Sequence, residues 1–416
     1  MPIQGGKHML ATLIPLFDNK MNVPAYSIFA QRENLFARPG LLGTGSLDMA
    51  ASVPGLEIVN NMGLDSVSDD RNVFIEVNEI SVFTDLENLC KVDHSKVILL
   101  GNSSIYPTEQ YVKRITELKK ASFSFAIKGL VYTQFEDYKP ILDLTDYILL
   151  NHKKINIAVA RTYFTKQYPK LKLIAVNVNT REEYEALADK ESYYLYEGEF
   201  FRVPVSTGGK ELAPLKANYI ELLNVVNAPD FDLTKAADTI SRDTALVISL
   251  LKLVNRISRN SEITSVRHAA AMHGQKDLKK WINTAVTKEL CADRPGEITR
   301  LSLLRAKFAE TLAPVFEKAG LASELFLMGL FSVLDIILEK PMSEALKLVN
   351  VGRGIQDALL KHEGELAPVL DFMTAYENAS FQEVSRQLLL KNIDDDAIYD
   401  AYVKSLIWYK DLFSVK

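Results

Sequence analysis

The first 204 residues alternate short apolar runs with amphipathic stretches, and this alternation constrains the fold more than any other feature of the chain. Unbroken apolar runs are typical of strands that are covered on both faces. Eight short β-type runs, several of them unbroken, stand at residues 13–17, 25–30, 73–78, 97–101, 124–128, 147–150, 173–178 and 194–196. Repeated strand–helix alternation predicts parallel βα units, and eight strands predict a barrel.

The stretches between these runs have helical spacing. In residues 108–120, Tyr111, Ile115 and Leu118 recur every three or four positions. Pro107 suits the first turn of that helix, where a missing N–H is not needed. A second helix is predicted over residues 181–190, so the first part of the chain has the order expected of an α/β fold.

A break in the pattern follows at VPVSTGGKELAP, residues 203–214, where Pro, Gly and Ser cluster without periodicity. Beyond it the apolar residues recur only at helical spacing, which predicts an all-α second part. We therefore expect a barrel domain over residues 1–204 and a helical domain over residues 205–395. A C-terminal helix over residues 396–416 is expected to pack on the helical domain.

Composition narrows the function classes. The chain has 416 residues, 48% hydrophobic and 24% charged, which is typical of two or three globular domains. Its formal net charge is −5 and its Lys and Arg residues are dispersed, so no nucleic-acid surface is expected. Cys90 and Cys291 are predicted to be reduced thiols of a cytoplasmic protein. The apolar run at residues 325–338 is too short to span a membrane and predicts one buried helix. No membrane partner is expected.

Four blocks in the second part carry a family resemblance. In order, they read DTALVISLLKLVNRIS, ITSVRHAAAMHGQKDLKKWI, RAKFAE, and FLMGLFSVLDIIL followed by ALKLVNV. Together they resemble the HDOD domain, which is similar in fold to HD phosphohydrolases but lacks their metal ligands. This chain contains no His-Asp dipeptide. The resemblance implies a module for protein interaction or signal output.

The first part resembles the EAL-type cyclic di-GMP phosphodiesterases. The opening IPLFDNKMNVPAYSIFAQ is similar to the family's first hairpin, and YYLYEGEFFRVP to its last strand. FSFAIKGL lies where the family has paired aspartates, and DYILLN where it has a lysine and an aspartate. The resemblance implies a βα barrel. It also implies a site in which carboxylates and an asparagine hold divalent ions that activate water.

The chain departs from that family at nearly every functional position. Ser27, Leu100 and Val176 replace glutamates, Glu76 replaces the asparagine, Lys128 and Gly129 replace the aspartate pair, Leu149 and Asn151 replace the lysine and aspartate, and Glu197 replaces a glutamine. Two divalent ions about 3.5–4 Å apart need several carboxylates around them. Lys128 would place a positive charge where a cation should bind, so we expect the barrel to be catalytically inactive.

These observations predict a bacterial pseudoenzyme that acts in signal transduction through protein–protein interaction. We expect no cofactor and no metal, an unidentified protein partner or a second copy of the chain, and no binding of cyclic di-GMP. Two alternatives remain open. One is a sensor that binds cyclic di-GMP without hydrolysing it, and the other is a residual metal-dependent phosphohydrolase.

A small basic patch is the candidate interaction face. Lys276, Lys279 and Lys280 lie beside Trp281, whose neighbours Leu278 and Ile282 indicate an apolar helix face. A solvated helix surface explains such a patch in most proteins, while an acidic partner surface is the functional alternative.

Overall fold

The chain forms two compact units. The computed structural model describes residues 9–32, 51–188, 193–203, 214–257 and 263–413. The barrel unit comprises Met1–Val203, Val315–Glu317 and Phe372–Lys416, and the helical unit comprises Pro204–Pro314 and Lys318–Asp371. The predicted boundary at residues 204 and 205 lies outside the described residues.

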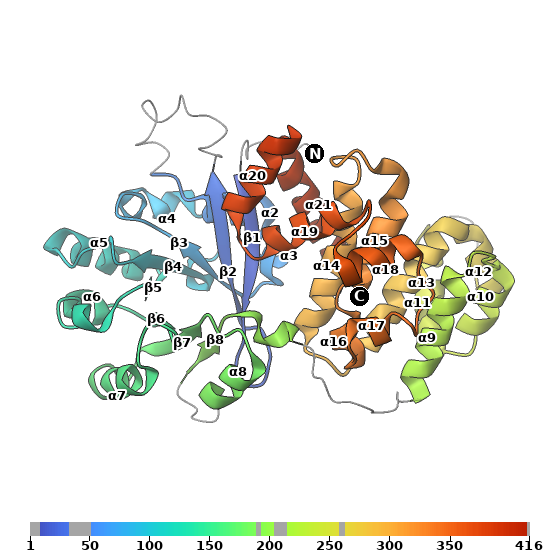
Figure 1. Cartoon of the computed structure of the whole chain (residues 1–416). Coiled ribbons are helices and arrows are strands. Elements are labelled where there is room, and N and C mark those ends of the chain that lie inside the picture. Colours follow the sequence, from blue (N-terminus) through green and yellow to red (C-terminus); the bar gives the residue numbers. More distant parts are fainter. Residues whose placement is uncertain (1–8, 33–50, 189–192, 204–213, 258–262, 414–416) are drawn as a thin grey trace. The chain divides into compact units, whose positions relative to one another are not determined.

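The barrel unit is built on one eight-stranded sheet whose strands follow their order in the chain (Figure 1). Its first two strands are antiparallel and every later neighbour pair is parallel. The strands are β1 (Met9–Leu16), β2 (Ala25–Arg32), β3 (Asn72–Glu76), β4 (Val97–Asn102), β5 (Ser124–Lys128), β6 (Tyr147–Asn151), β7 (Lys172–Val176) and β8 (Leu195–Tyr196). All eight predicted strands are present, and the α/β prediction for this part is confirmed.

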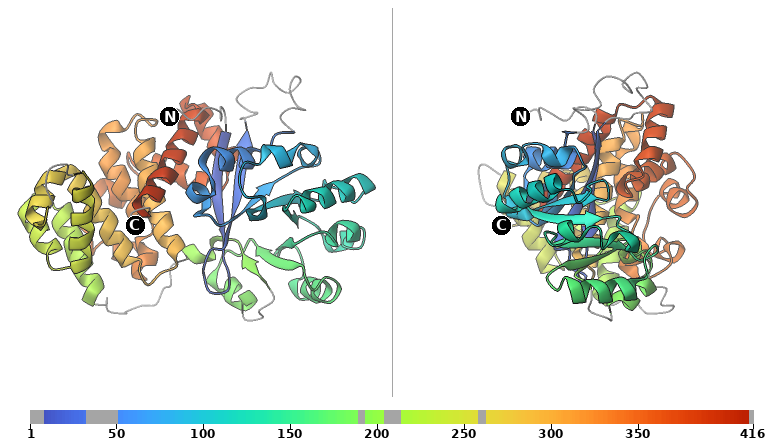
Figure 2. Two further views of the ribbon diagram at one scale, coloured as in Figure 1. Left: turned by 180° about the vertical axis from the view of Figure 1, so that it is seen from behind. Right: turned by 90° about the vertical axis from the view of Figure 1, so that its left-hand side faces the viewer.

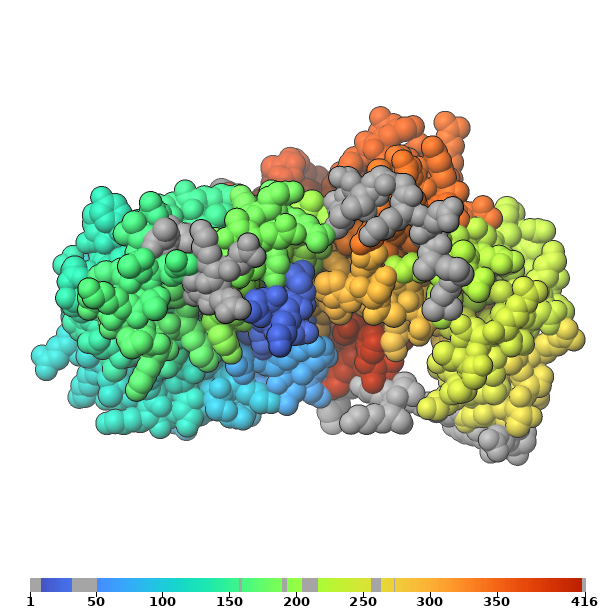
Figure 3. All heavy atoms as spheres, turned by 90° about the horizontal axis from the view of Figure 1, so that it is seen from below, coloured from blue at the N-terminus to red at the C-terminus, as the bar shows by residue number. Residues whose placement is uncertain are grey.

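Within the described ranges, one backbone bridge joins the two ends of the curled sheet. Phe17, which follows β1, exchanges two backbone hydrogen bonds of 2.8 Å with Tyr196 of β8. The ring of Phe17 packs on Phe200 and Phe201, with ring centroids 5.3 and 4.6 Å apart. Figure 3 shows the blue turn between β1 and β2 beside the green segment that ends the barrel.

Alternate residues of each strand point into the sheet's concave side, as period-two geometry requires. One cluster of buried apolar side chains contains alternate residues from all eight strands, including Phe74, Leu100, Ala126, Leu149 and Ile174. The concave side of the sheet therefore holds a packed core, as the interior of βα barrels does.

Helices connect the parallel strands. Figures 1 and 2 show α5, α6 and α7 along the outer side of the sheet. The connecting helices are α2 (Pro54–Met62), α3 (Leu64–Ser68), α4 (Leu86–Leu89), α5 (Glu109–Lys120), α6 (Lys139–Leu142), α7 (Ile157–Gln167) and α8 (Arg181–Ala188). The predicted helix at residues 108–120 agrees with α5, in which Ile115 and Leu118 are buried.

The C-terminal segment differs from its predicted place. Residues 396–416 were expected to pack on the helical domain, and residues up to 395 to belong to it. Instead, the chain from Phe372 onward belongs to the barrel unit. It contains the end of α19 (Ala367–Glu377), α20 (Phe381–Lys391) and α21 (Asp395–Phe413), and α21 contacts β1 and α3. The physical reason is that these helices cover the part of β1 that has no strand beside it.

The helical unit contains no strand among its described residues, so the all-α prediction for this part is confirmed. Its helices are α9 (Pro214–Asn227), α10 (Leu233–Ile240), α11 (Thr244–Ile257), α12 (Val266–His273), α13 (Gln275–Leu290), α14 (Gly296–Leu312), α15 (Ala322–Phe331), α16 (Leu334–Leu338), α17 (Met342–Ala345), α18 (Arg353–Lys361) and the start of α19.

Helices α14 and α15 pack closely because of a glycine. A Cβ atom at Gly329 would lie 2.3 Å from the carbonyl oxygen of Arg305, so only glycine permits this backbone approach. The apolar run at residues 325–338 was predicted as one helix. It is divided between α15 and α16, because the backbone turns at Ser332 and Val333.

No described helix is both long enough and apolar enough to cross a membrane.

Candidate functional site

The functional positions inferred from the EAL resemblance gather at one end of the barrel. Glu76, Lys128, Asn151 and Val176 are the last residues of β3, β5, β6 and β7, and Glu197 directly follows β8. Each of them comes two positions after an inward-pointing core residue, so all of these side chains point to the inner side of the sheet. The carboxyl ends of parallel strands form the functional end of βα barrels. We call this end the barrel mouth.

An ion pair lies at the mouth. The ammonium group of Lys128 contacts the Glu76 carboxylate and donates a hydrogen bond to it. The two residues stand on β3 and β5, on either side of β4. Both side chains are about one third exposed, at 38% for Glu76 and 33% for Lys128, so water partly screens their attraction.

Glu197 is the second carboxylate of the mouth. Its backbone N–H donates to Ala175 and its carbonyl accepts from Val178, which fixes it beside β7. Burial raises the pKa of Glu197, and the charge of Glu76 raises it further, while the charge of Lys128 opposes both effects. This carboxyl therefore favours its protonated form more than an exposed glutamate does.

The remaining matched positions carry no charge. Ser27, Leu100 and Leu149 are buried in the barrel wall. The Asn151 side chain accepts the backbone N–H of Lys153 at 3.0 Å and so caps the turn after β6. Gly129 has φ of +78° and open space where a Cβ would lie.

A histidine at the mouth was not predicted from the sequence. His152 shares a 3.0 Å hydrogen bond with the carbonyl of Val176 through Nδ1, and its Nε2 lies 3.4 Å from Glu183. Glu183 accepts the backbone N–H of Asn179, and this hydrogen bond lowers the pKa of the carboxyl. The available signal was the polar run NHKK directly after a predicted strand.

The charges of the mouth do not fit a pair of divalent ions. Glu76 and Glu197 are the carboxylates at the matched positions, and the ammonium of Lys128 already contacts the first. A cation placed there would meet a like charge and would have too few oxygen ligands. Among the described residues, one group of three possible ligands lies close enough to share an ion, and it consists of Asp394, Asp395 and Asp396. They lie at the start of α21, where the exposed Asp394 accepts the N–H of Asp396.

The predicted basic face is smaller than its sequence indicates. Lys276 is exposed, but Lys280 forms an ion pair of 2.6 Å with Glu310 and lies 4.6 Å from the ring centre of Phe326. Burial lowers the pKa of Lys279 and of Lys280, although Glu310 opposes the shift in Lys280. The expected patch of three exposed lysines is therefore not present. The reason is that α14 and α15 cover this side of α13.

Comparison with known protein families identifies the domain that the helical part forms. Residues 212–354 match the family of the HDOD domain. The chain contains an HDOD domain. The HDOD resemblance seen in the sequence is thereby confirmed, and the helical unit holds nearly all of the matched residues.

Two curated bacterial proteins are similar to most of the chain. An uncharacterised Bacillus subtilis protein, YuxH, is 26% identical over 416 positions, covering 97% of this chain and 98% of that protein. The Vibrio cholerae protein named cyclic di-GMP phosphodiesterase CdgJ is 25% identical over 312 positions. That match covers 74% of this chain and 71% of CdgJ.

Solved EAL-type structures are similar to the N-terminal half. Klebsiella pneumoniae BlrP1, solved as a manganese and cyclic di-GMP complex, has a TM-score of 0.39 at 12% identity. The match covers 48% of this chain and 56% of BlrP1. The PaMucR phosphodiesterase, solved with cyclic di-GMP, has a TM-score of 0.37 at 12% identity, covering 46% of this chain and 89% of that one. Both scores describe a distant likeness.

Proposed function

We propose that this chain is a non-catalytic signalling protein related to cyclic di-GMP pathways, and that it acts by binding a protein partner. In this proposal the barrel does not hydrolyse cyclic di-GMP. The HDOD domain, a family without the metal ligands of HD hydrolases, contributes binding and not chemistry.

The Lys128–Glu76 ion pair is the observation that carries the proposal. The Lys128 side chain takes up the carboxylate that a metal ion would need. Phosphodiester hydrolysis of this kind requires a metal-activated water. Loss of one acid–base group alone lowers a rate by about 10²–10⁴-fold, and here the ion-binding set itself is incomplete.

Two other functions compete with this proposal. The relative CdgJ is named a cyclic di-GMP phosphodiesterase, which favours residual hydrolysis. A barrel of this type that binds cyclic di-GMP without cleaving it would be a sensor. The polar side chains of the mouth, such as Asn151 and His152, are compatible with such binding.

The test combines calorimetry with a hydrolysis assay on the full chain. Titration with Mn²⁺ or Mg²⁺ should give no binding heat for the natural protein, and cyclic di-GMP should remain intact in the presence of either ion. The Lys128→Asp variant is the matched control. It removes the ammonium and adds a third carboxylate to Glu76 and Glu197, so Mn²⁺ binding should appear.

Each result separates the functions. Metal-dependent turnover that is lost in Glu76→Gln would show a phosphohydrolase and refute the proposal. Cyclic di-GMP binding without turnover would establish the sensor instead. No metal binding by the natural chain together with a gain in Lys128→Asp would support the proposed role of the ion pair.

A further inference from the structure

Three connections at the barrel mouth expose an unusual number of large apolar side chains. We call the first part of each connection, residues 77–88 after β3, residues 103–109 after β4 and residues 129–138 after β5, the acidic rim. Its exposed apolar residues are Ile80 at 36%, Phe83 at 46%, Tyr106 at 57%, Val131 at 43% and Tyr132 at 74%. Exposed apolar groups gathered at one place mark binding surfaces, and aromatic residues are enriched in protein interfaces.

The charges of the rim have one sign. Its sequence contains six carboxylates and not one Lys or Arg. The acids are Glu79, Asp85, Glu87, Glu109, Glu136 and Asp137. By contrast, the whole chain is nearly balanced, with 48 basic and 53 acidic residues. The rim is thus a local concentration of negative charge among exposed rings.

The three connections touch one another and so form one surface. The hydroxyl of Ser104 donates to Glu79, which joins the first two. The ring of Phe83 also lies 5.0 Å from that of Tyr111 in α5, the helix that follows the second. The Tyr138 hydroxyl donates to the carbonyl of Ser103 at 2.7 Å, which joins the second and third.

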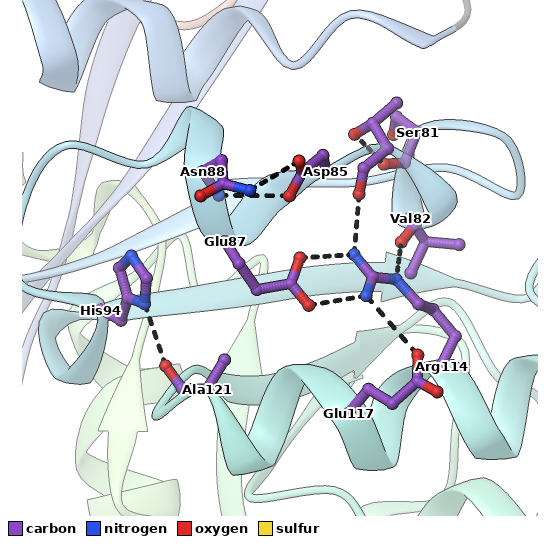
Figure 4. Close-up of polar contacts among 10 residues, drawn as sticks. Ser81, Val82, Asp85, Glu87, Asn88, His94, Arg114, Glu117 and Ala121 are labelled. Atoms are coloured by element: carbon purple, nitrogen blue, oxygen red, sulfur yellow. Dashed lines mark hydrogen bonds and ion pairs between the residues drawn. The ribbon is translucent and has the colours of Figure 1, made fainter.

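An arginine of α5 fixes the first connection in place (Figure 4). Arg114 donates to the carbonyls of Val82 and Thr84 at 2.9 and 2.7 Å, on both sides of the exposed Phe83. It also forms a two-pronged ion pair with Glu87 at 2.7 and 2.8 Å. Such a clamp presents Phe83 from a pre-ordered loop, and pre-ordered groups lose less entropy when they bind.

Most of the rim's negative charge stays unneutralised. Arg114 pairs with Glu87, and Lys139, the first residue of α6, pairs with Glu136. Among the described residues, Glu79, Asp85, Glu109 and Asp137 have no ion pair with a Lys or Arg. The hydrogen bond from Ser104 lowers the pKa of Glu79, which keeps that group ionised.

We propose that the acidic rim is the docking surface for a basic segment of a partner protein, one in which Lys or Arg alternate with apolar residues. This inference rests on the proposed role in protein binding. Apolar side chains of the segment would pack on Tyr132, Tyr106 and Phe83, and its cations would face the surrounding carboxylates. The same charges repel nucleic acid and anionic lipid, which narrows the occupant to a protein.

A labelled amphipathic peptide of Leu and Lys is the probe, and fluorescence anisotropy with the full chain gives its affinity. A peptide with Glu in place of each Lys should not bind. The rim variant Asp137→Lys with Tyr132→Ala should weaken binding of the Leu–Lys peptide by roughly tenfold or more, since central aromatic residues dominate interfaces. Added salt should weaken it as well.

The matched control changes the same kinds of groups elsewhere in the barrel unit. Glu182→Lys with Leu390→Ala alters an exposed acid and an apolar side chain that is 72% exposed, and it should keep the natural affinity within about twofold. Equal loss in both double variants would refute the inference. So would a self-association that sedimentation detects in the natural chain and that the rim variant abolishes, because the occupant would then be a second copy. Neither result would restore hydrolysis, so failure of this inference is distinct from failure of the proposed function.

Discussion

The hydroxyl of Tyr376 accepts the backbone N–H of Ala11 at 3.1 Å, across 365 positions of sequence. Ala11 is the third residue of β1, and Tyr376 is a fully buried residue of α19. The ring of Tyr376 packs against Phe381 and Tyr402, at 5.6 and 5.1 Å between centroids. Because β8 reaches only Phe17 at this seam, the C-terminal helices supply the missing neighbour of β1.

Removing that hydroxyl should destabilise the barrel unit. Tyr376→Phe keeps the ring but leaves the Ala11 N–H without its acceptor, which should lower the free energy of unfolding by about 1–3 kcal/mol. Tyr399→Phe is the matched control, because the buried Tyr399 hydroxyl has no hydrogen-bond partner. Chemical denaturation should show a loss only for the first variant. Equal stabilities for both would mean that the Tyr376–Ala11 bond contributes nothing.

Truncation tests the same relationship on a larger scale. A chain that ends at Asp371 lacks α20, α21 and the second half of α19, which exposes β1. We expect hydrogen exchange in β1 and β2 to accelerate strongly, because the unit loses buried apolar contacts such as the pair Phe29 and Phe381. If amides of the helical unit lost protection while β1 and β2 stayed protected, the C-terminal helices would belong to the HDOD domain.

The contrast between strands and C-terminal helices explains what a sequence can predict. Each strand was predicted from a local run, such as the apolar residues before Lys128. A strand that is covered on both faces is apolar along its length, and this pattern is visible in the sequence. In α21 the buried Ile398, Tyr402 and Leu406 also form a pattern. Such a pattern shows that one face of the helix is buried, but not which element covers it. Here the covering element is β1, at the opposite end of the chain.

Two glycines of the barrel mouth should respond differently to alanine. Gly129 and Gly198 have backbone φ angles of +78° and +148°, which residues other than glycine rarely adopt. A Cβ at Gly129 meets nothing within 4 Å, while one at Gly198 would lie 1.9 Å from the carbonyl oxygen of Val178.

Gly129→Ala should therefore lower the free energy of unfolding by only about 1–2 kcal/mol, from backbone strain alone. Gly198→Ala adds a backbone clash, and we expect more than about 4 kcal/mol or failure to fold. Urea unfolding with circular dichroism measures both. Similar small losses in the two variants would show that β7 and β8 separate easily at this point.

The candidate site was only partly predictable. The EAL resemblance placed Glu76, Lys128 and Glu197 at matched functional positions, and the predicted strands placed each of them at or just after a strand end. The contact between Lys128 and Glu76 depends on the strand order, in which only β4 separates their strands. No local pattern in the sequence gives that order. In α13 the pattern indicated a basic face, and no local pattern indicated that Phe326 and Glu310 of other helices cover Lys280.

Charge reversal on α13 should distinguish its covered lysine from its exposed one. Lys280→Glu breaks the pair with Glu310 and places two carboxylates together, which should lower the free energy of unfolding by about 2 kcal/mol. The exposed Lys276→Glu should change it by less than about 0.5 kcal/mol. Thermal unfolding of both variants checks this. If Lys280→Glu left the free energy of unfolding unchanged, the Lys280 side chain would be solvated, and the basic face of α13 would be exposed as the sequence predicted.

The raised pKa of Glu197 predicts a pH-dependent stability. A carboxyl with a higher pKa in the folded chain favours folding while protonated. That stabilisation is complete below the unfolded pKa of about 4.3, and it is lost as the pH rises through the folded pKa. Glu197→Gln stays neutral, so it should be more stable than the natural chain at pH 7. The difference in the free energy of unfolding should be about 1.4 kcal/mol for each tenfold decrease in the acid dissociation constant of Glu197 on folding. It should fall to zero toward pH 4.

Glu79→Gln is the opposite control. Hydrogen bonding from Ser104 lowers the pKa of Glu79, so this group stabilises the fold when ionised and loses that effect as the pH falls. Its variant should be slightly less stable than the natural chain at pH 7, and by a small amount because the side chain is exposed. Urea titrations between pH 4 and pH 8 give both differences. Parallel stability curves for Glu197→Gln and the natural chain would show that the Glu197 carboxyl is solvated at the mouth and ionises as freely as in the unfolded chain.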